Sequence, residues 1–412
     1  MKINLIPNKK NIQEDKIKTQ PNKKTIINLP NKTVLTDKKI VHINYNIITA
    51  EPKTISTKDF QLKIFQEINR SNFGKNIMIS PMSIYHILSL TANGAANKTL
   101  TEMLQALSEN KLIDLNQKNN IISKLFTNFK SIELANAVFT RFKPLNEFNK
   151  MIIEYKAKLD ILKDTNQINK WCSDATHQKI TKIIDAITNN DKMVLINAIY
   201  FNGIWHQPFD KNCTEFGDFF GPNNQIKKIQ FMNATKNYDY FEESGIQAIS
   251  LNYTKDNLKA VIILPKRKNI INNYIANFTS EKYKTIIDNL GNKKVKLSLP
   301  KFEFKFSAEL SQNLKFLGMK EAFTNKADFS IMKKEKDIWI SRIIHKTYIK
   351  VDEKGTEAAA VTAVVMKGPT IAIRPDPIPV MKVDHPFLFI IRSNDLQIRN
   401  DIIFMSKVES LE

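Results

Sequence analysis

The chain of 412 residues carries few side chains that could act as an acid, a base or a nucleophile. Its six histidines are scattered, and its two cysteines, Cys172 and Cys213, stand far apart. His345 could serve as a base toward a serine or an asparagine, but no acid stands at a useful spacing. The sequence also lacks the Gly-x-Ser-x-Gly, His-Glu-x-x-His and P-loop motifs. We therefore expect no catalytic residue, no metal site and no cofactor.

The two cysteines are too few for a disulfide framework, so we expect free thiols, with a single bridge as the alternative. Residues 1–7 lack the apolar segment of a secretory signal. This favours a cytoplasmic or unconventionally exported protein, with an extracellular one as the alternative. The longest apolar runs, residues 260–264 and 387–391, are far shorter than the ~20 residues of a membrane helix, so we expect no membrane span.

The chain is strongly basic, with 62 Lys and Arg against 41 Asp and Glu and a formal net charge of +21. Lysines are spread along the whole sequence, which is typical of a solvated surface. The alternative is attraction to a polyanion, such as a heparin-like glycosaminoglycan, DNA or an anionic membrane. Small clusters such as Lys266-Arg267-Lys268 and Lys293-Lys294 are compatible with it but form no strong nucleic-acid motif.

The composition changes near residue 55. Residues 1–55 hold 11 Lys against 4 Asp and Glu, are rich in Asn, Thr and Ile, and show no sustained period of 2 or 3.6. This composition predicts a basic, disordered N-terminal extension that could act as an anchor, an address or a polyanion-binding arm. From residue 56 onward, helical and strand patterns alternate, so we expect one large folded domain over residues 56–412.

The segment Glu353–Met366 stands out by its small side chains. After Glu357 it contains only Ala, Val, Thr and Met. Val and Thr favour a strand, whereas Lys367-Gly368-Pro369 and the three later prolines favour an exposed loop. Both patterns are satisfied if the segment is exposed in one state and becomes a buried strand in another.

The sequence Glu-Lys-Gly-Thr-Glu-Ala-Ala-Ala-x-Thr-Ala, residues 353–363, resembles the hinge of the reactive-centre loop of inhibitory serpins. Two further stretches resemble the same family: Ser-Pro-x-Ser-Ile from Ser80, and Leu-x-Asn-Ala-x-Tyr-Phe-x-Gly-x-Trp from Leu195 to Trp205. The resemblance covers residues 56–412, with Ser406 as a mild departure where the family usually has Gly. It implies an α+β serpin fold with three β-sheets, eight or nine helices and a reactive-centre loop over about residues 353–380.

The resemblance also implies functional positions. The hinge would consist of Glu353, Gly355, Thr356, Glu357, Ala358, Ala359 and Ala360. A buried polar cluster under the main sheet would contain His345 and Asn197 with Ser80 or Ser83. Trp205 would lie at the upper end of the sheet, where the hinge enters.

For function, the resemblance implies a suicide inhibitor of serine proteases, with cysteine proteases as an alternative target. The family's usual count from Glu353 reaches Pro369, which makes a poor substrate bond, so we expect cleavage at Lys367–Gly368 by a trypsin-like enzyme, with Met366 as the alternative. Competing hypotheses are a non-inhibitory serpin (a carrier, a chaperone or a plain substrate) and a polyanion-binding scaffold. We expect a monomer whose exposed Ala/Val run could insert into the sheet of another copy and form polymers.

Overall fold

The computed structural model describes residues 25–28, 32–36, 39–43, 46–49, 56–356 and 377–412. The chain divides into two compact units, Met1–Lys53 and Thr54–Glu412.

The first unit contains two antiparallel strand pairs. The strands are β1 (Thr25–Asn28), β2 (Lys32–Thr36), β3 (Lys39–Ile43) and β4 (Asn46–Thr49). β1 pairs with β4, and β2 pairs with β3. The composition predicted no strand here; the Ile, Val and Thr that fill these segments suit a pleated backbone even without strict alternation. The remaining residues of the expected extension lie outside the described residues.

The described part of the second unit contains nine α-helices and three 3₁₀ turns. They are α1 (Lys58–Ser71), α2 (Pro81–Ala92), α3 (Asn97–Ala106), α4 (Leu112–Asn128), α5 (Asn146–Glu154), α6 (Thr165–Ala175), α7 (Ile271–Ala276), α8 (Ser280–Asn289), α9 (Ser311–Phe316), η1 (Lys211–Cys213), η2 (Pro222–Asn224) and η3 (Glu321–Phe323).

Helix α2 begins as the sequence predicts. Ser80 is its N-cap and accepts a hydrogen bond from the Ser83 backbone N–H, and Pro81 fills the first helical position. The sequence Ile168-Asn169-Lys170-Trp171 predicts the opening of a helix, but α6 starts earlier, at Thr165, because the carboxylate of Asp164 caps it. The apolar pattern of residues 146–159 predicts a single helix, but α5 ends at Glu154 because Lys158–Ile161 form an edge strand.

Seven strands form the main sheet. They are β6 (Ile132–Thr140), β7 (Lys158–Ile161), β8 (Met193–Phe201), β9 (Gly203–Ile204), β15 (Phe302–Glu309), β16 (Ile340–Val351) and β17 (Gly355–Thr356). Their order is β7-β6-β8-β16-β17-β9, and β15 pairs with the other edge of β16. Every residue of β8 is buried, as expected for a central strand covered on both faces.

Nine strands form the second sheet. They are β5 (Ile77–Ile79), β10 (Thr214–Phe220), β11 (Ile226–Glu242), β12 (Ile246–Asn252), β13 (Leu258–Pro265), β14 (Gly291–Pro300), β18 (Val380–Lys382), β19 (Phe387–Ser393) and β20 (Ile402–Val408). Strand β11 is 17 residues long and pairs with β10, β14 and β12 in turn. It thereby joins two of the three expected sheets into one. The α+β class is confirmed.

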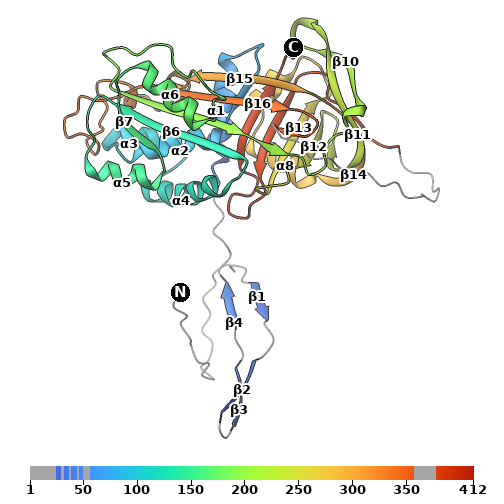
Figure 1. Ribbon diagram of the computed structural model, residues 1–412, viewed down its shortest axis with the longest axis horizontal. Coiled ribbons are helices and arrows are strands. Elements are labelled where there is room, and N and C mark those ends of the chain that lie inside the picture. The colour runs from blue at the N-terminus through green and yellow to red at the C-terminus, as the bar shows by residue number, and fades with distance from the viewer. Residues whose placement is uncertain (1–24, 29–31, 37–38, 44–45, 50–55, 357–376) are drawn as a thin grey trace. The chain divides into compact units, whose positions relative to one another are not determined.

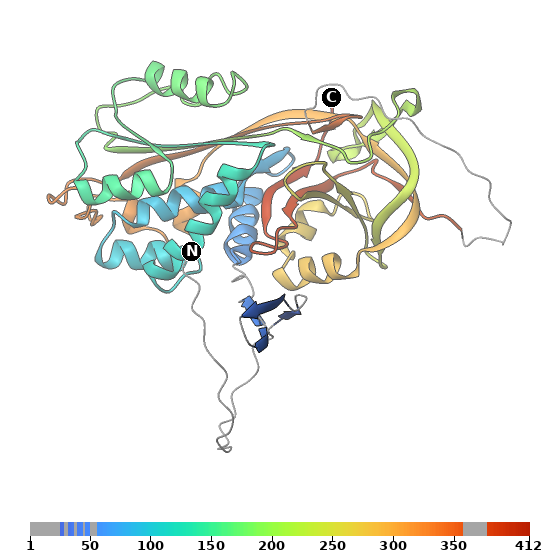
Figure 2. The same ribbon diagram turned by 60° about the horizontal axis from the view of Figure 1, so that its bottom comes forward.

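The main sheet separates two apolar cores. Figures 1 and 2 show α6 on one face of this sheet, with α2 to α5 on the other. The smaller core lies under α6 and includes Ile168 and Cys172 of that helix with Val194 and Ile196 of β8. The larger core lies on the opposite face and continues between the two sheets. A strand added to the main sheet would therefore be buried on both faces.

Candidate functional site: a loop hinge above a polar cluster

The central feature of the main sheet is a direct parallel pairing of β8 with β16. The register runs from Met193 beside Ile340 to Tyr200 beside Tyr348. Above Tyr348 the two strands no longer pair. There β16 pairs instead with β17, which pairs in turn with β9. The seam between β8 and β16 is thus closed along its length and open at its upper end.

The first residues of the expected hinge occupy this opening. Thr356 is fully buried, pairs with Val351 of β16, and its hydroxyl lies 2.8 Å from the Tyr253 hydroxyl. Gly355 packs against Gly203 so closely that an added Cβ would lie 2.1 Å from the Gly203 carbonyl oxygen. Only glycine fits at this approach.

Trp205 holds the turn that precedes the hinge. Its backbone N–H donates to the Lys354 carbonyl at 2.9 Å, and its indole N–H donates to the Asp352 carbonyl at 3.0 Å. Its ring stacks on Tyr253 with 4.5 Å between centroids. Trp205 therefore lies beside the first residues of the expected hinge, at one end of the main sheet.

Glu353 anchors the hinge to the second sheet. Its carboxylate accepts hydrogen bonds from the Thr214 hydroxyl at 2.8 Å and from the Lys301 ammonium at 3.1 Å. Burial opposes ionisation of this carboxyl, but hydrogen bonds from its own backbone N–H, Thr214 and Lys301 outweigh burial and lower its pKa. No local pattern predicts Lys301 as the partner of Glu353, because the two residues lie 52 positions apart along the chain.

The four residues of the expected polar cluster meet beneath the seam. His345 and Asn197 are directly paired residues of β16 and β8, with 2.5 Å between His345 Nδ1 and Asn197 Oδ1. The Ser83 hydroxyl donates to Asn197 Oδ1 at 2.8 Å, and the Ser80 backbone N–H donates to His345 Nε2 at 3.1 Å. Since Nε2 accepts, the proton of the neutral imidazole lies on Nδ1 and is donated to Asn197.

The cluster extends further than the sequence predicts. Asn197 donates to the Asn136 amide oxygen on β6, and the Asn136 nitrogen lies 3.0 Å from His86 Nδ1 on α2. His86 Nε2 lies 2.7 Å from the Ser123 hydroxyl on α4. The signal in the sequence was His86, a polar residue in the otherwise largely apolar helix α2, which is buried on every side. A buried histidine needs hydrogen-bond partners, and these partners form the extension. The network links two helices to three strands of the sheet.

Both imidazoles of the network are held neutral. Burial lowers the pKa of His345 to about 3, although its hydrogen bond with Asn197 opposes that shift, and burial lowers the pKa of His86 to about 3. Within the described residues, no carboxylate forms a hydrogen bond or an ion pair with either ring. These values indicate a structural role for His345 and argue against a role as a general base near neutral pH.

The neutral histidines predict that the protein loses stability in mild acid. Between pH ~6.5 and ~3 the unfolded chain binds protons that the folded protein excludes, so stability falls as the pH falls. At pH ~4.5 each histidine accounts for a loss of about 2–3 kcal/mol relative to pH 7. Thermal unfolding of the protein and of a His345→Gln variant at both pH values measures this. An equal pH dependence of the two would contradict the role of His345.

The other expected positions lie elsewhere or are not described. Glu357, Ala358, Ala359, Ala360, Met366, Lys367 and Gly368 lie outside the described residues. Cys172 is buried, Cys213 is exposed, and both are free. Across residues 56–356 and 377–412, no group of three or more His, Cys, Asp or Glu could hold a metal ion. No described helix is both long and apolar enough to cross a membrane.

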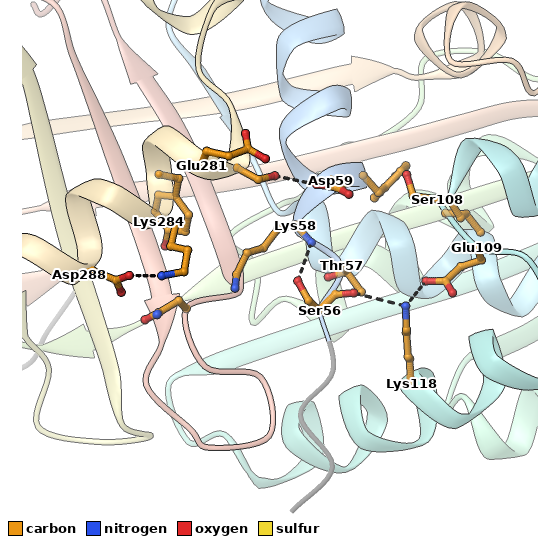
Figure 3. Close-up of a pocket in the computed structure, with 15 residues that line it drawn as sticks. Ser56, Thr57, Lys58, Asp59, Ser108, Glu109, Lys118, Glu281, Lys284 and Asp288 are labelled. Atoms are coloured by element: carbon orange, nitrogen blue, oxygen red, sulfur yellow. Dashed lines mark hydrogen bonds and ion pairs between the residues drawn. The ribbon is translucent and has the colours of Figure 1, made fainter. Parts of the chain in front are cut away.

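A hollow of about 440 Å³ lies at the start of α1, between α1 and α8 (Figure 3). Its charged groups are largely satisfied within it: Lys118 pairs with Glu109, Lys284 pairs with Asp288, and Asp59 accepts a hydrogen bond from Ser280. None of its lining residues belongs to the hinge or to the polar cluster. We therefore assign it no part in the mechanism.

The fold agrees with the comparison to known proteins. The family model for serpins, described as serine protease inhibitors, matches residues 55–411. The chain belongs to the serpin family. Its family is accordingly one of protease inhibitors and not of enzymes.

Relatives cover almost the whole second unit. Human serpin B8 is 33% identical over an alignment of 373 residues, and the alignment covers 85% of this chain and 97% of that protein. The thermophilic serpin tengpin in its native state superposes with a TM-score of 0.79 at 32% identity and covers 87% of this chain and 97% of its own. Human thyroxine-binding globulin superposes with a TM-score of 0.77 at 26% identity, covering 86% and 97%. The family thus also contains a protein named for binding a small molecule.

Proposed function

We propose that the chain inhibits serine proteases by offering the loop of residues 353–380 as a substrate. After cleavage, the hinge would insert between β8 and β16. The observation that supports this most is the seam itself: two buried strands pair directly, and Thr356 already lies at the open end between β16 and β9.

The chemistry of capture belongs to the protease. Its serine oxygen attacks the carbonyl carbon of the bait residue, the peptide bond breaks, and the amine of the next residue leaves with a proton. The loop is then held to the protease as an ester. Residues 356–366 as a strand span about 36 Å at ~3.3 Å per residue. Inserting them would carry the ester-linked protease to the opposite end of the sheet before water can hydrolyse the ester.

The register supports this length. Thr356 pairs antiparallel with Val351, so the same pairing continued down β16 places residue 366 beside residue 341, near the lower end of that strand. The run without charge, Gly or Pro therefore matches the length of the seam. A charge or a proline within it would interrupt the strand or would have to be buried.

Continuing the same register sets Thr362 beside His345. Insertion would separate His345 from Asn197, leaving the His345 Nδ1–H without an acceptor and Asn197 Oδ1 with Ser83 as its remaining donor. Thr362 carries the only hydroxyl between residues 358 and 366, and a hydroxyl can accept from His345 and donate to Asn197.

We expect Thr362→Val to destabilise the cleaved protein by about 1–3 kcal/mol relative to Thr362→Ser, because Val keeps the shape but leaves the buried His345 N–H unpaired. The intact proteins should unfold alike. Calorimetry of the intact and the cleaved form of each variant tests this prediction. Equal melting temperatures of the two cleaved variants would refute the register.

We propose Lys367–Gly368 as the scissile bond, with Met366 as the alternative bait. A lysine suits the trypsin-like class, whose specificity pocket carries an aspartate. Incubation with a panel of trypsin-, elastase- and chymotrypsin-like serine proteases and one cysteine protease tests the function and the target class. We expect a covalent complex stable in SDS with a trypsin-like enzyme, together with a released fragment that begins at Gly368. A Lys367→Ala variant should lose that complex.

The panel also separates the alternatives. Cleavage at the loop without any covalent complex would mean that the chain is a plain substrate, as expected for a carrier or chaperone. A fragment beginning at Lys367 would move the bait residue to Met366. Polyanion binding stays a second proposal, favoured by Lys293, Lys294 and Lys296 on β14: all three are exposed, and none forms an ion pair within the described part of the chain.

A further inference from the structure

A second, separate cavity lies beside the strand segment that holds the hinge. It measures about 320 Å³ and is formed by residues 205–207 and by the facing strands β11, β12 and β14. Of its ten lining residues, eight carry polar side chains, in addition to Trp205 and Leu251. None of the ten is a lysine or an arginine. Four of them are amides, namely Gln207, Asn237, Asn252 and Asn292.

The sheet register explains why these side chains meet. Asp239 pairs directly with Ser250 on one side and with Asn292 on the other, so the three side chains lie on one face of the sheet. Asn237 and Asn252 stand two positions away from Asp239 and Ser250 and share that face. The sheet therefore presents a continuous polar surface to the cavity.

Ser250 forms part of the lining without a partner. Its side chain is 3% exposed, and its hydroxyl forms no hydrogen bond within the described residues. A buried hydroxyl without a partner is costly, and native proteins nearly always satisfy it. The Ser250 hydroxyl therefore points to a molecule that occupies the cavity and is hydrogen-bonded there.

The charges define the class of that molecule. Asp239, the only carboxylate in the lining, is neutralised by Lys259 at 3.1 Å. Without a cation in the lining, an anion such as phosphate or sulfate finds no counter-charge. The amides and hydroxyls offer donors and acceptors in similar numbers. We propose that the cavity binds a small neutral polyhydroxylated molecule, a monosaccharide or a sugar alcohol.

The position of the cavity links it to the hinge, and this part of the inference rests on the proposed function. The His206 backbone N–H donates to the Asn252 carbonyl, while the neighbouring Trp205 backbone N–H donates to Lys354 at the hinge. A ligand that bridges residues 206–207 to β12 braces the native arrangement of Trp205. By thermodynamic linkage, it should bind the intact protein more tightly than the cleaved, loop-inserted form.

Binding can be tested on the intact full-length chain with D-glucose and D-mannitol as probes and D-glucuronate as a charged comparison. Saturation-transfer NMR and a titration of chemical shifts give the Kd, which we expect in the millimolar range for ligands of this size. Ser250→Ala and Asn237→Leu should each weaken binding about five-fold, as expected for the loss of one hydrogen bond. Thr235→Ala is the matched control, because Thr235 is exposed on the same face of β11 but outside the lining.

Saturable binding that weakens in both cavity variants and not in Thr235→Ala supports the site. No saturable binding of either neutral probe, or equal binding by all variants, overturns it, as does tighter binding of glucuronate. A Kd that rises several-fold in the cleaved protein supports the link to the hinge. If cleavage raises the melting temperature but leaves the Kd unchanged, the link between the cavity and the hinge is refuted. If cleavage changes neither quantity, the insertion mechanism fails. In that case the binding data on the intact protein alone decide whether the cavity is a ligand site.

Discussion

Replacing Ala358 by arginine should convert the protein from an inhibitor of its target protease into a substrate. Thr356 pairs with Val351, so the same register sets residue 358 beside Ile349, which is completely buried. An inserted strand with arginine at this position would have to bury an unpaired guanidinium, at a cost of several kcal/mol. We expect cleavage to continue while the yield of covalent complex falls more than about ten-fold, measured by gel densitometry in SDS.

Ala358→Val is the matched control, because it adds bulk at the same position without charge and favours a strand. The Ala358→Val variant should give most of the covalent protease complex that the unchanged chain gives. The position is better suited to this test than Thr356, whose side chain is already buried in the intact protein, so that a charge there would disturb both states. If Ala358→Arg traps protease as well as the unchanged chain does, the hinge does not insert in the proposed register.

Cleavage within the loop should make the protein markedly more heat-resistant. The intact chain leaves the seam between β8 and β16 filled only at its upper end, where Thr356 lies. Cleavage would let a further ten residues join the ladders of both strands and bury their Ala and Val side chains in the two cores on either face of the sheet. The intact fold is then a kinetically trapped state. A net gain of several kcal/mol raises the midpoint of thermal unfolding by roughly 10 °C or more in a unit of this size.

Circular dichroism melts before and after limited proteolysis measure the shift, with mass spectrometry to confirm a single cut. The cleaved Ala358→Arg variant is the internal control, because its loop is cut but cannot insert, and it should melt near the temperature of the intact chain. A cleaved protein that melts at the intact temperature would rule out insertion, whatever the fate of the protease.

Local sequence carries enough information to predict the central strand β8. The run from Met193 to Phe201 is apolar on both faces of a strand, so it predicts a covered central strand whose single amide needs a buried partner. The small-residue run after Gly355 predicts a second, buried location for residues that lie outside the described part of the chain. These constraints act within one strand or loop, so they do not depend on which distant segments pack against it.

Partners across the chain could not be predicted in the same way. Lys301 reaches Glu353, and His86 reaches Asn136, only because strands and helices from different parts of the chain are brought together. Likewise, the row of Asp239, Ser250 and Asn292 exists only through the register of three strands. The end of α5 at Glu154 could not be predicted for a related reason. The helical pattern continues to residue 159, but residues from Lys158 onward pair with β6 at the edge of the sheet.

The contact between Gly355 and Gly203 sets a narrow aperture at the top of the seam. An added methyl group at Gly355 would already collide with the backbone of Gly203. If the loop inserts as proposed, a change that widens this aperture would speed its insertion after cleavage. The same change would admit the loop of a neighbouring molecule at the same ladder positions. Under the proposed mechanism, the contact between the two glycines would therefore set both the rate of protease capture and the resistance to self-association.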